Sequence, residues 1–220
     1  MPSGPLVLSL EVALAATALS AIFGVPLAAL LANRRFPGRE ILDALLSSPL
    51  VLPPTVLGYY LLVVLGRRTA LGQLYESLTG SSIVFTRVGA VLAALVGALP
   101  IVVKAGRASL SAVDPVLLAA ARTLGAGPLR AFFTVQLPLA GHGIAAALML
   151  AFARSLGEFG VTLMVAGNIP DRTRTASMAI YDAIQAGRDE EALGFVVALS
   201  AIAIACLYGI NTLASRRDVR

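Results

Sequence analysis

Two ionisable residues interrupt a long apolar stretch of the chain, and their spacing is the first sign of a functional arrangement. Arg154 and Glu158 stand four positions apart, which places them on one face of a helix. A charged side chain near the centre of a bilayer costs about 2.5–3.5 kcal/mol, so such residues face a partner, the interior of a bundle or water. In one interpretation this face lines a conduit, with Ser155 and Thr162 beside it. In the other, the two charges form an internal ion pair that only fixes helix packing.

Other reactive residues lack the companions that catalysis or metal binding requires. His142 is the single histidine and Cys206 the single cysteine, so a cysteine-based metal cluster and a disulfide within the chain are both excluded. Lys104 is the single lysine and is not part of a G-x-x-x-x-G-K-[ST] sequence, so the chain has no P-loop for ATP. We therefore expect no enzymatic activity, no metal and no bound cofactor. Any ATP would be used by a separate partner ATPase.

The composition indicates the surroundings of the chain. Hydrophobic residues make up 58% and charged residues 13%, whereas a soluble domain carries about 25% charged residues. The mean hydropathy is +0.86, so the expected environment is lipid. A net charge of +5 can indicate nucleic acid. The arginines flank apolar segments and form no single patch, however, so no nucleic-acid partner is expected.

Five uncharged stretches are candidates for membrane spans, for which a helix needs about 20 apolar residues. They cover residues 12–33, 44–66, 88–103, 131–153 and 192–215. The third stretch is short, but Arg87 and Lys104 at its ends can extend to the headgroups. We therefore predict an all-α, polytopic membrane protein with five transmembrane helices.

Prolines and glycines predict the ends and bends of two stretches. The fourth stretch contains Pro138, so its helix is expected to begin near Gly141 and to continue to about Ala166. Pro53 and Pro54 remove two amide donors from the second stretch and predict a kink there. Such a kink can form a gate or be a packing irregularity.

Basic residues indicate the orientation, because they are more frequent on the cytoplasmic side. With the N-terminus outside, ten fall in cytoplasmic segments and six in external ones. The cytoplasmic set is Arg34, Arg35, Arg39, Lys104, Arg107, Arg122, Arg130, Arg216, Arg217 and Arg220, and the external set is Arg67, Arg68, Arg87, Arg172, Arg174 and Arg188. We predict the N-terminus outside and the C-terminus inside. The first stretch follows Glu11 and has no basic n-region, so we expect it to be retained rather than cleaved as a signal peptide.

The connection between the third and fourth spans, residues 111–143, carries strong helix signals. Asp114 followed by Pro115 is a helix start, and Gly125 is a suitable C-terminal stop. A second helix can begin at Pro128 and end by Pro138. Two short, alanine-rich helices at an angle would allow another protein to approach closely. The alternative is an amphipathic helix on the membrane surface.

This connection resembles the cytoplasmic signature of importer permeases of the ATP-binding-cassette (ABC) class, which is E-A-A, three residues, G, nine residues, I-x-L-P. The spacing is met in full, with Ala119 in place of the glutamate and Val135 in place of isoleucine. The matching positions are Ala119, Ala120, Ala121, Arg122, Gly125, Val135, Leu137 and Pro138. In that family the segment, here about 107–140, is the coupling helix region that seats in a groove on the ATPase subunit. Ala119 removes a carboxylate that could pair with a basic residue there.

Two further segments resemble permeases that import oxyanions. Residues 48–68, SPLVLPPTVLGYYLLVVLGRR, and 152–175, FARSLGEFGVTLMVAGNIPDRTRT, are similar to spans of molybdate permeases. GEFG followed by AGNIP is shared with sulfate permeases, whereas PPTVLGYYLL, GNIPDRTRT and the compact length favour molybdate.

The resemblance implies one type-1 ABC transporter transmembrane domain over residues 1–220, with its core at about 8–213, in the bacterial cytoplasmic membrane. The implied partners are a second copy of the chain, two ABC ATPase subunits, an extracytoplasmic oxyanion-binding protein and the lipid bilayer. The path or gate is expected at Pro53, Pro54, Arg154, Ser155, Glu158 and Thr162, and docking of the binding protein at Asn168, Asp171, Arg172 and Arg174. The alternatives are a permease for sulfate, thiosulfate or tungstate and an ion-coupled secondary transporter, whose fold commonly shows inverted repeats.

Overall fold

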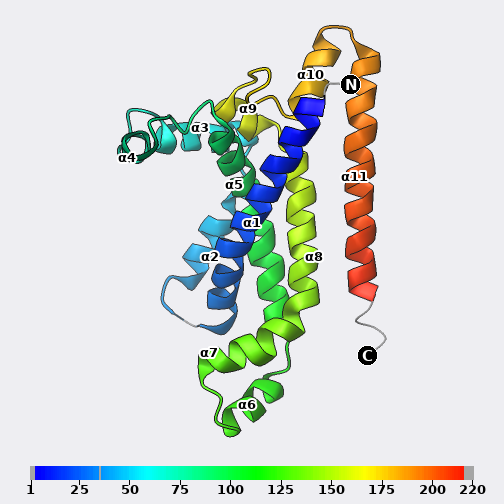
Figure 1. Ribbon diagram of the computed structural model, residues 1–220. Coiled ribbons are helices and arrows are strands. Elements are labelled where there is room, and N and C mark those ends of the chain that lie inside the picture. Colours follow the sequence, from blue (N-terminus) through cyan, green and yellow to red (C-terminus); the bar gives the residue numbers. More distant parts are fainter. Residues whose placement is uncertain (1–2, 35, 216–220) are drawn as a thin grey trace.

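Helices account for every regular element in the computed structural model, which describes residues 3–34 and 36–215 (Figure 1). The all-α prediction is confirmed. Arg35, Arg216, Arg217 and Arg220, expected in cytoplasmic segments, lie outside the described residues. The elements are α1 (Ser3–Asn33), α2 (Arg39–Ser47), a 3-10 turn (Ser48–Leu50), α3 (Pro54–Leu65), α4 (Ala70–Thr79), α5 (Arg87–Ser111), α6 (Pro115–Thr123), α7 (Pro128–Ala131), a π-turn (Phe132–Gln136), α8 (Leu137–Leu156), α9 (Gly160–Ala166), α10 (Ala176–Gln185) and α11 (Asp189–Ser215).

Four helices in the described part of the chain are long and apolar enough to cross a membrane. They are α1, α5, the continuous helix Pro128–Leu156 and α11. The fifth expected span is a bent pair, Arg39–Leu50 followed by Pro54–Leu65, whose axes differ by 114°. The prediction of five spans therefore holds only if this pair is counted as one broken span.

The bend between α2 and α3 is where the sequence predicted a kink. Pro53 is extended, with φ −56° and ψ 142°, and Pro54 is the first residue of α3. A residue that precedes a proline is driven out of the helical region, so two consecutive prolines end one helix and start another. As a result α3 and α4 run across the direction of the long helices, and α4 lies at the far end of this arm (Figure 1).

Small residues hold the centre of the bundle together. The helix α5 packs between α1 and α8. A Cβ atom at Gly24 of α1 would lie 3.0 Å from Val102 Cγ1 of α5, and one at Gly106 of α5 would lie 3.2 Å from the Ala28 Cβ. These helices therefore cross closely, as small residues permit inside membranes. The outer helix α11 packs against α8 and α10.

Three helices extend beyond the uncharged stretches that predicted them and include charged residues at their ends. The helix α1 starts at Ser3 and includes Glu11, whose carboxylate lies 3.3 Å from the guanidinium of Arg87. The helix α5 continues to Ser111, and Lys104 on it binds Asp43 of α2 at 2.9 Å. The helix α11 begins three residues earlier than expected, at Asp189.

The fourth span differs from its prediction at both ends. It does not begin near Gly141, because a helix already runs without interruption from Pro128 to Leu156. The second connecting helix accordingly does not end by Pro138. At the other end the helix stops at Leu156 instead of continuing to Ala166, and α9 begins after a break.

Candidate functional site

The connection expected to contact an ATPase forms two helices at one end of the bundle (Figure 1). The carboxylate of Asp114 accepts a hydrogen bond of 2.8 Å from the Val116 amide and so caps α6. Gly125 has φ +84°, and the amide of Ala126 donates to the Ala121 carbonyl at 3.0 Å. This is the Schellman termination that a C-terminal glycine predicts, so both helix signals are confirmed.

The surface of this coupling segment (residues 111–138) is open and partly apolar. Leu124 is 88% exposed and Leu129 is 75% exposed. The signature positions are exposed or half-buried, namely Ala119, Ala120, Ala121, Arg122, Gly125, Val135, Leu137 and Pro138. Exposed leucines beside small alanines are compatible with contact to another protein or to the membrane surface. The carboxylate that Ala119 lacks would therefore have stood on the accessible surface.

The proline of the signature explains how the coupling segment joins the bundle. Pro138 has no amide to donate to the Thr134 carbonyl, and its ring would crowd that carbonyl in a regular helix. The chain widens into a π-turn at Phe132–Gln136, in which the Leu137 amide donates to the Phe132 carbonyl. π-turns inside helices are frequent at functional positions.

Two of the breaks in the fold meet at the candidate gate. A Cβ atom at Gly160, the first residue of α9, would lie 2.7 Å from the Pro54 Cβ at the start of α3. Farther along the same pair of helices, a Cβ at Gly58 would lie 2.7 Å from the Met164 sulfur. The structure thus brings the candidate gate residue Pro54 directly against the segment that follows Glu158.

Arg154 and Glu158 form the ion pair that their spacing predicted, although Glu158 lies beyond the end of the helix. The guanidinium nitrogen of Arg154 is 2.7 Å from Glu158 Oε2, and the side chains are 42% and 3% exposed respectively. The other carboxylate oxygen accepts a hydrogen bond of 3.1 Å from the Val161 amide, so it caps α9. The pair lies next to Gly97 of α5, where a Cβ would be in ordinary contact with Glu158 Oε2 at 3.4 Å.

The other two candidate path residues are enclosed by protein. Ser155 is 5% exposed and Thr162 is 1% exposed. The carbonyl of Ser155 accepts the Glu158 amide at 3.2 Å. Of the expected path residues, Arg154, Pro53 and Pro54 therefore present accessible surface, whereas Ser155, Glu158 and Thr162 are buried around the break.

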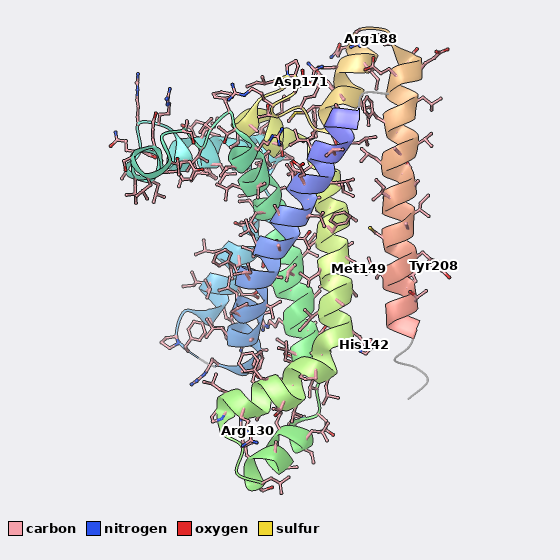
Figure 2. The ribbon with its side chains drawn as sticks, in the orientation of Figure 1. Arg130, His142, Met149, Asp171, Arg188 and Tyr208 are labelled. Atoms are coloured by element: carbon pink, nitrogen blue, oxygen red, sulfur yellow. The ribbon has the colours of Figure 1, made fainter. Side chains whose placement is uncertain are left out.

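The loop between α9 and α10 contains the residues expected to dock a binding protein, and two of them are tied to the fold. The Asn168 amide donates to Asp182 Oδ1 at 2.7 Å, and Arg174 Nε donates to Asn168 Oδ1 at 2.9 Å. Arg174 also binds Asp182 Oδ2 at 2.9 Å. Asp171 and Arg172 are exposed, and Asp171 has φ +59°. Figure 2 shows Asp171 at the end of the molecule opposite Arg130 of the coupling segment.

Candidate metal ligands are dispersed in the part of the chain that the structure describes. No group of three or more His, Cys, Asp and Glu side chains is arranged to hold a metal ion among those residues. His142 is exposed on α8.

Several structurally important residues could not be predicted from the sequence, because their partners are distant in the chain. Asp43 binds both Lys104 and Arg107, at 2.9 and 3.0 Å. Gln136 exchanges hydrogen bonds with Asn33, 103 residues away. The only signal for Gln136 in the sequence was an amide at the variable position of I-x-L-P.

The arrangement matches a known group of proteins. The family described as "Binding-protein-dependent transport system inner membrane component" matches residues 24–217. This chain belongs to that family. It is therefore a multi-pass membrane protein of a family of transport subunits, as the signature in the coupling segment predicted.

Relatives within the permease family carry names of oxyanion transporters. The "Molybdenum transport system permease protein ModB" of Escherichia coli (strain K12) is 50% identical over 178 residues, which cover 81% of this chain and 78% of the relative. The "Sulfate transport system permease protein CysT" of Salmonella typhimurium (strain LT2) is 34% identical over 208 residues, or 94% of this chain and 75% of the relative.

A solved structure shares the fold. The permease chain in an inward-facing structure of the MetNI methionine ABC transporter gives a TM-score of 0.67 at 16% identity, over 95% of this chain and 94% of that chain. At this level of identity the likeness shows the fold, which is that of the type I ABC importer permeases and agrees with the predicted class.

Proposed function

We propose that this chain is the membrane-spanning permease subunit of an ATP-driven importer that translocates molybdate across the cytoplasmic membrane. One observation carries the proposal: the coupling segment and the loop with Asp171 lie at opposite ends of a membrane bundle (Figure 2). A permease needs this separation, because the ATPase and the binding protein act from opposite sides. The 50% identity to an E. coli molybdenum permease supports molybdate as the cargo.

The proposed assembly contains two copies of this chain, with the path at their two-fold interface. Two ATPase subunits bind the coupling segments on the cytoplasmic side, and an oxyanion-binding protein docks at the other face. The N-terminus lies outside and the C-terminus inside. ATP binding draws the ATPases together, and the coupling segments tilt the spans between inward-open and outward-open states, a rigid-body movement of packed helices. The chain itself binds no nucleotide.

The contact between α3 and α9 supports a gate at the place where these two helices meet. Both helices are short, both begin at a break in a longer element, and Pro54 touches Gly160 where they meet. A pair of short helices held by close contacts at Gly160 and Gly58 can shift together when the long helices tilt.

The charge distribution at the break suits an anion that passes without being held. The Glu158 carboxylate is buried and paired, so its charge is largely neutralised by Arg154. Arg154 is partly exposed and can lower the electrostatic barrier for an anion. Tight binding is not required, because the binding protein selects the cargo.

Reconstitution tests the proposal. Proteoliposomes that contain this chain, its ATPase and its binding protein should take up molybdate only when ATP and both other subunits are present. Competition with sulfate, thiosulfate and tungstate distinguishes the cargoes, and preferential uptake of sulfate would replace molybdate in the proposal. Uptake by this chain alone, driven by an ion gradient, would overturn the importer assignment and favour a secondary transporter.

A further inference from the structure

An amide pair formed by the buried Gln136 and the exposed Asn33 joins the coupling segment to the bundle. Asn33 Nδ2 donates to Gln136 Oε1 at 3.0 Å, and Gln136 Nε2 donates to Asn33 Oδ1 at 2.8 Å. The same Gln136 nitrogen donates to the Leu110 carbonyl at 3.2 Å. Gln136 is 4% exposed, so its amide depends on these three bonds. We call this arrangement of Asn33, Gln136 and the Leu110 carbonyl the amide clasp.

The amide clasp connects three elements at the point where force would enter the membrane bundle. Gln136 is the last residue of the π-turn that follows α7. Asn33 is the last residue of α1, and Leu110 lies in the last turn of α5. The helices α1 and α5 pack along much of their length. A displacement of Gln136 would therefore act on both helices at once.

The surroundings make the clasp selective for one relative position of these elements. Leu110 belongs to an apolar cluster with Ala28, Val113, Ala140 and Ile144, against which Phe132 and Leu137 pack. A buried amide that loses its partner costs about 1–3 kcal/mol, more than a formed bond contributes. Sliding α1 or α5 past the π-turn would break these bonds, and the buried Gln136 amide would gain no water in exchange, whereas the exposed Asn33 would. The elements are therefore held in register.

The π-turn explains why such a clasp is needed. A wide turn next to Pro138 is a natural bending point in the helix Pro128–Leu156. If the coupling segment were pushed, this turn could flex and absorb the displacement before it reached α8. Gln136 is the last residue of this turn, so its bonds to Asn33 and to the Leu110 carbonyl tie the turn to α1 and α5 and pass the displacement to both helices.

We propose that Gln136 is a positioning residue that makes α1 and α5 follow the coupling segment, so that transport stays coupled to ATP hydrolysis. This inference rests on the proposed function as an ATP-driven permease. Gln136, at the variable position of the I-x-L-P signature, and Asn33 thereby acquire a role. Neither residue belongs to α6, so their role in transmitting movement is distinct from the binding of α6 to the ATPase.

The test compares uptake per ATP hydrolysed in the reconstituted transporter. Gln136→Leu removes all three bonds, and Asn33→Ala removes two of them at an exposed residue that the fold tolerates. Thr134→Val is the matched control, since Thr134 is an exposed polar residue of the same π-turn. We expect Gln136→Leu to lower molybdate uptake per ATP about tenfold, which corresponds to a coupling free energy of about 1.4 kcal/mol. Asn33→Ala should lower it less, and Thr134→Val should leave it unchanged.

An exchange of the two amides tests the pairing itself. Asn33→Gln combined with Gln136→Asn keeps both amides and should recover part of the coupling that Gln136→Leu loses. A purely structural role would lower assembly or the ATPase rate together with uptake, whereas the clasp predicts that the ATPase rate remains. If Gln136→Leu fails to assemble, Asn33→Ala decides the question. Wild-type uptake per ATP in Asn33→Ala, and in Gln136→Leu where it assembles, would overturn the inference.

A distance measurement separates this inference from the proposed function. Spin labels at Thr123 of α6 and Ile22 of α1, attached in a Cys206→Ser background, report whether the two elements move together when ATP is added to the complex. In the wild type the distance should stay nearly constant, and in Gln136→Leu it should change, because α6 moves without α1. A change in the wild type equal to that in Gln136→Leu would overturn the clasp. If the wild type keeps this distance but takes up no molybdate, the cargo is wrong and the clasp stands.

Discussion

Gly160 at the start of α9 lies directly against Pro54 at the start of α3, and a Cβ at position 160 would be 2.7 Å from the Pro54 Cβ. The Pro54 Cβ cannot move aside easily, because it belongs to a rigid pyrrolidine ring. This contact joins the two places where long elements break, so it determines how α3 and α9 are positioned.

Gly160→Ala should destabilise the protein by about 1–3 kcal/mol, the usual cost of overpacking a tight contact. Gly157→Ala is the matched control, since the nearest atom to a Cβ there is 3.9 Å away. Thermal unfolding of the purified complex and uptake in proteoliposomes measure the two effects. If Gly160→Ala has the same melting temperature and the same uptake rate as Gly157→Ala, the contact has no role at the gate.

Arg154→Gln should leave the Glu158 carboxylate buried without its cation. Because Arg154 is partly exposed, we discount the loss to about 1–2 kcal/mol of unfolding free energy. The double variant Arg154→Gln with Glu158→Gln removes both charges and should recover part of that stability while leaving anion uptake low. If Arg154→Gln and Glu158→Ala both insert and assemble but transport normally, the pair only fixes helix packing.

Gly125→Ala should strain the end of α6, because an L-residue at φ +84° pays about 1–2 kcal/mol for the left-handed conformation. Open space surrounds the position, so the effect is conformational and not steric. Gly127→Ala is the control, since Gly127 has φ −65° and equally open surroundings. The ATPase rate of the complex should fall in Gly125→Ala alone. Equal rates in both variants would show that the shape of α6 is unimportant to the partner.

Asp182→Asn should loosen the loop between α9 and α10, because Asp182 holds both Asn168 and Arg174. We expect a loss of about 1–2 kcal/mol, since the ion pair is mostly shielded from water and hydrogen-bonded. The comparison is Arg172→Ala, which alters an exposed side chain of the same loop. Arg172→Ala should keep the melting temperature and weaken binding-protein affinity by about two- to fivefold, as expected for an exposed charge at an interface. Unchanged affinity would remove Arg172 from the docking surface.

The sequence predicted those parts of the structure that depend on local chemistry. Apolar stretches located the spans, Asp114 and Gly125 marked both ends of α6, and the spacing of Arg154 and Glu158 gave their ion pair. Helix caps and i,i+4 pairs involve neighbours in the chain, so their residue types carry enough information.

The remaining features depend on contacts between distant segments. Two prolines indicated a bend but not its size of 114°, which is fixed by the packing of α3 on α9. The break before α9 was missed because Gly157 and Gly160 stand in an apolar run that otherwise resembles one helix. Pro138 suggested the end of one helix and the start of the next near Gly141, but a π-turn accommodated it within a continuous helix. The amide clasp was invisible because Asn33 and Gln136 are polar residues at opposite ends of different spans.

The most direct test of the account asks which side of the membrane each end of the bundle faces. Ala119→Cys and Asp171→Cys, each in a Cys206→Ser background, are exposed to a membrane-impermeant maleimide in spheroplasts. The account predicts that the cysteine at position 171 reacts in intact spheroplasts, whereas the cysteine at position 119 reacts only after the membrane is opened and is protected by the ATPase subunit. Labelling at position 119 in intact spheroplasts would place the coupling segment outside the cell and contradict ATP-driven transport through it.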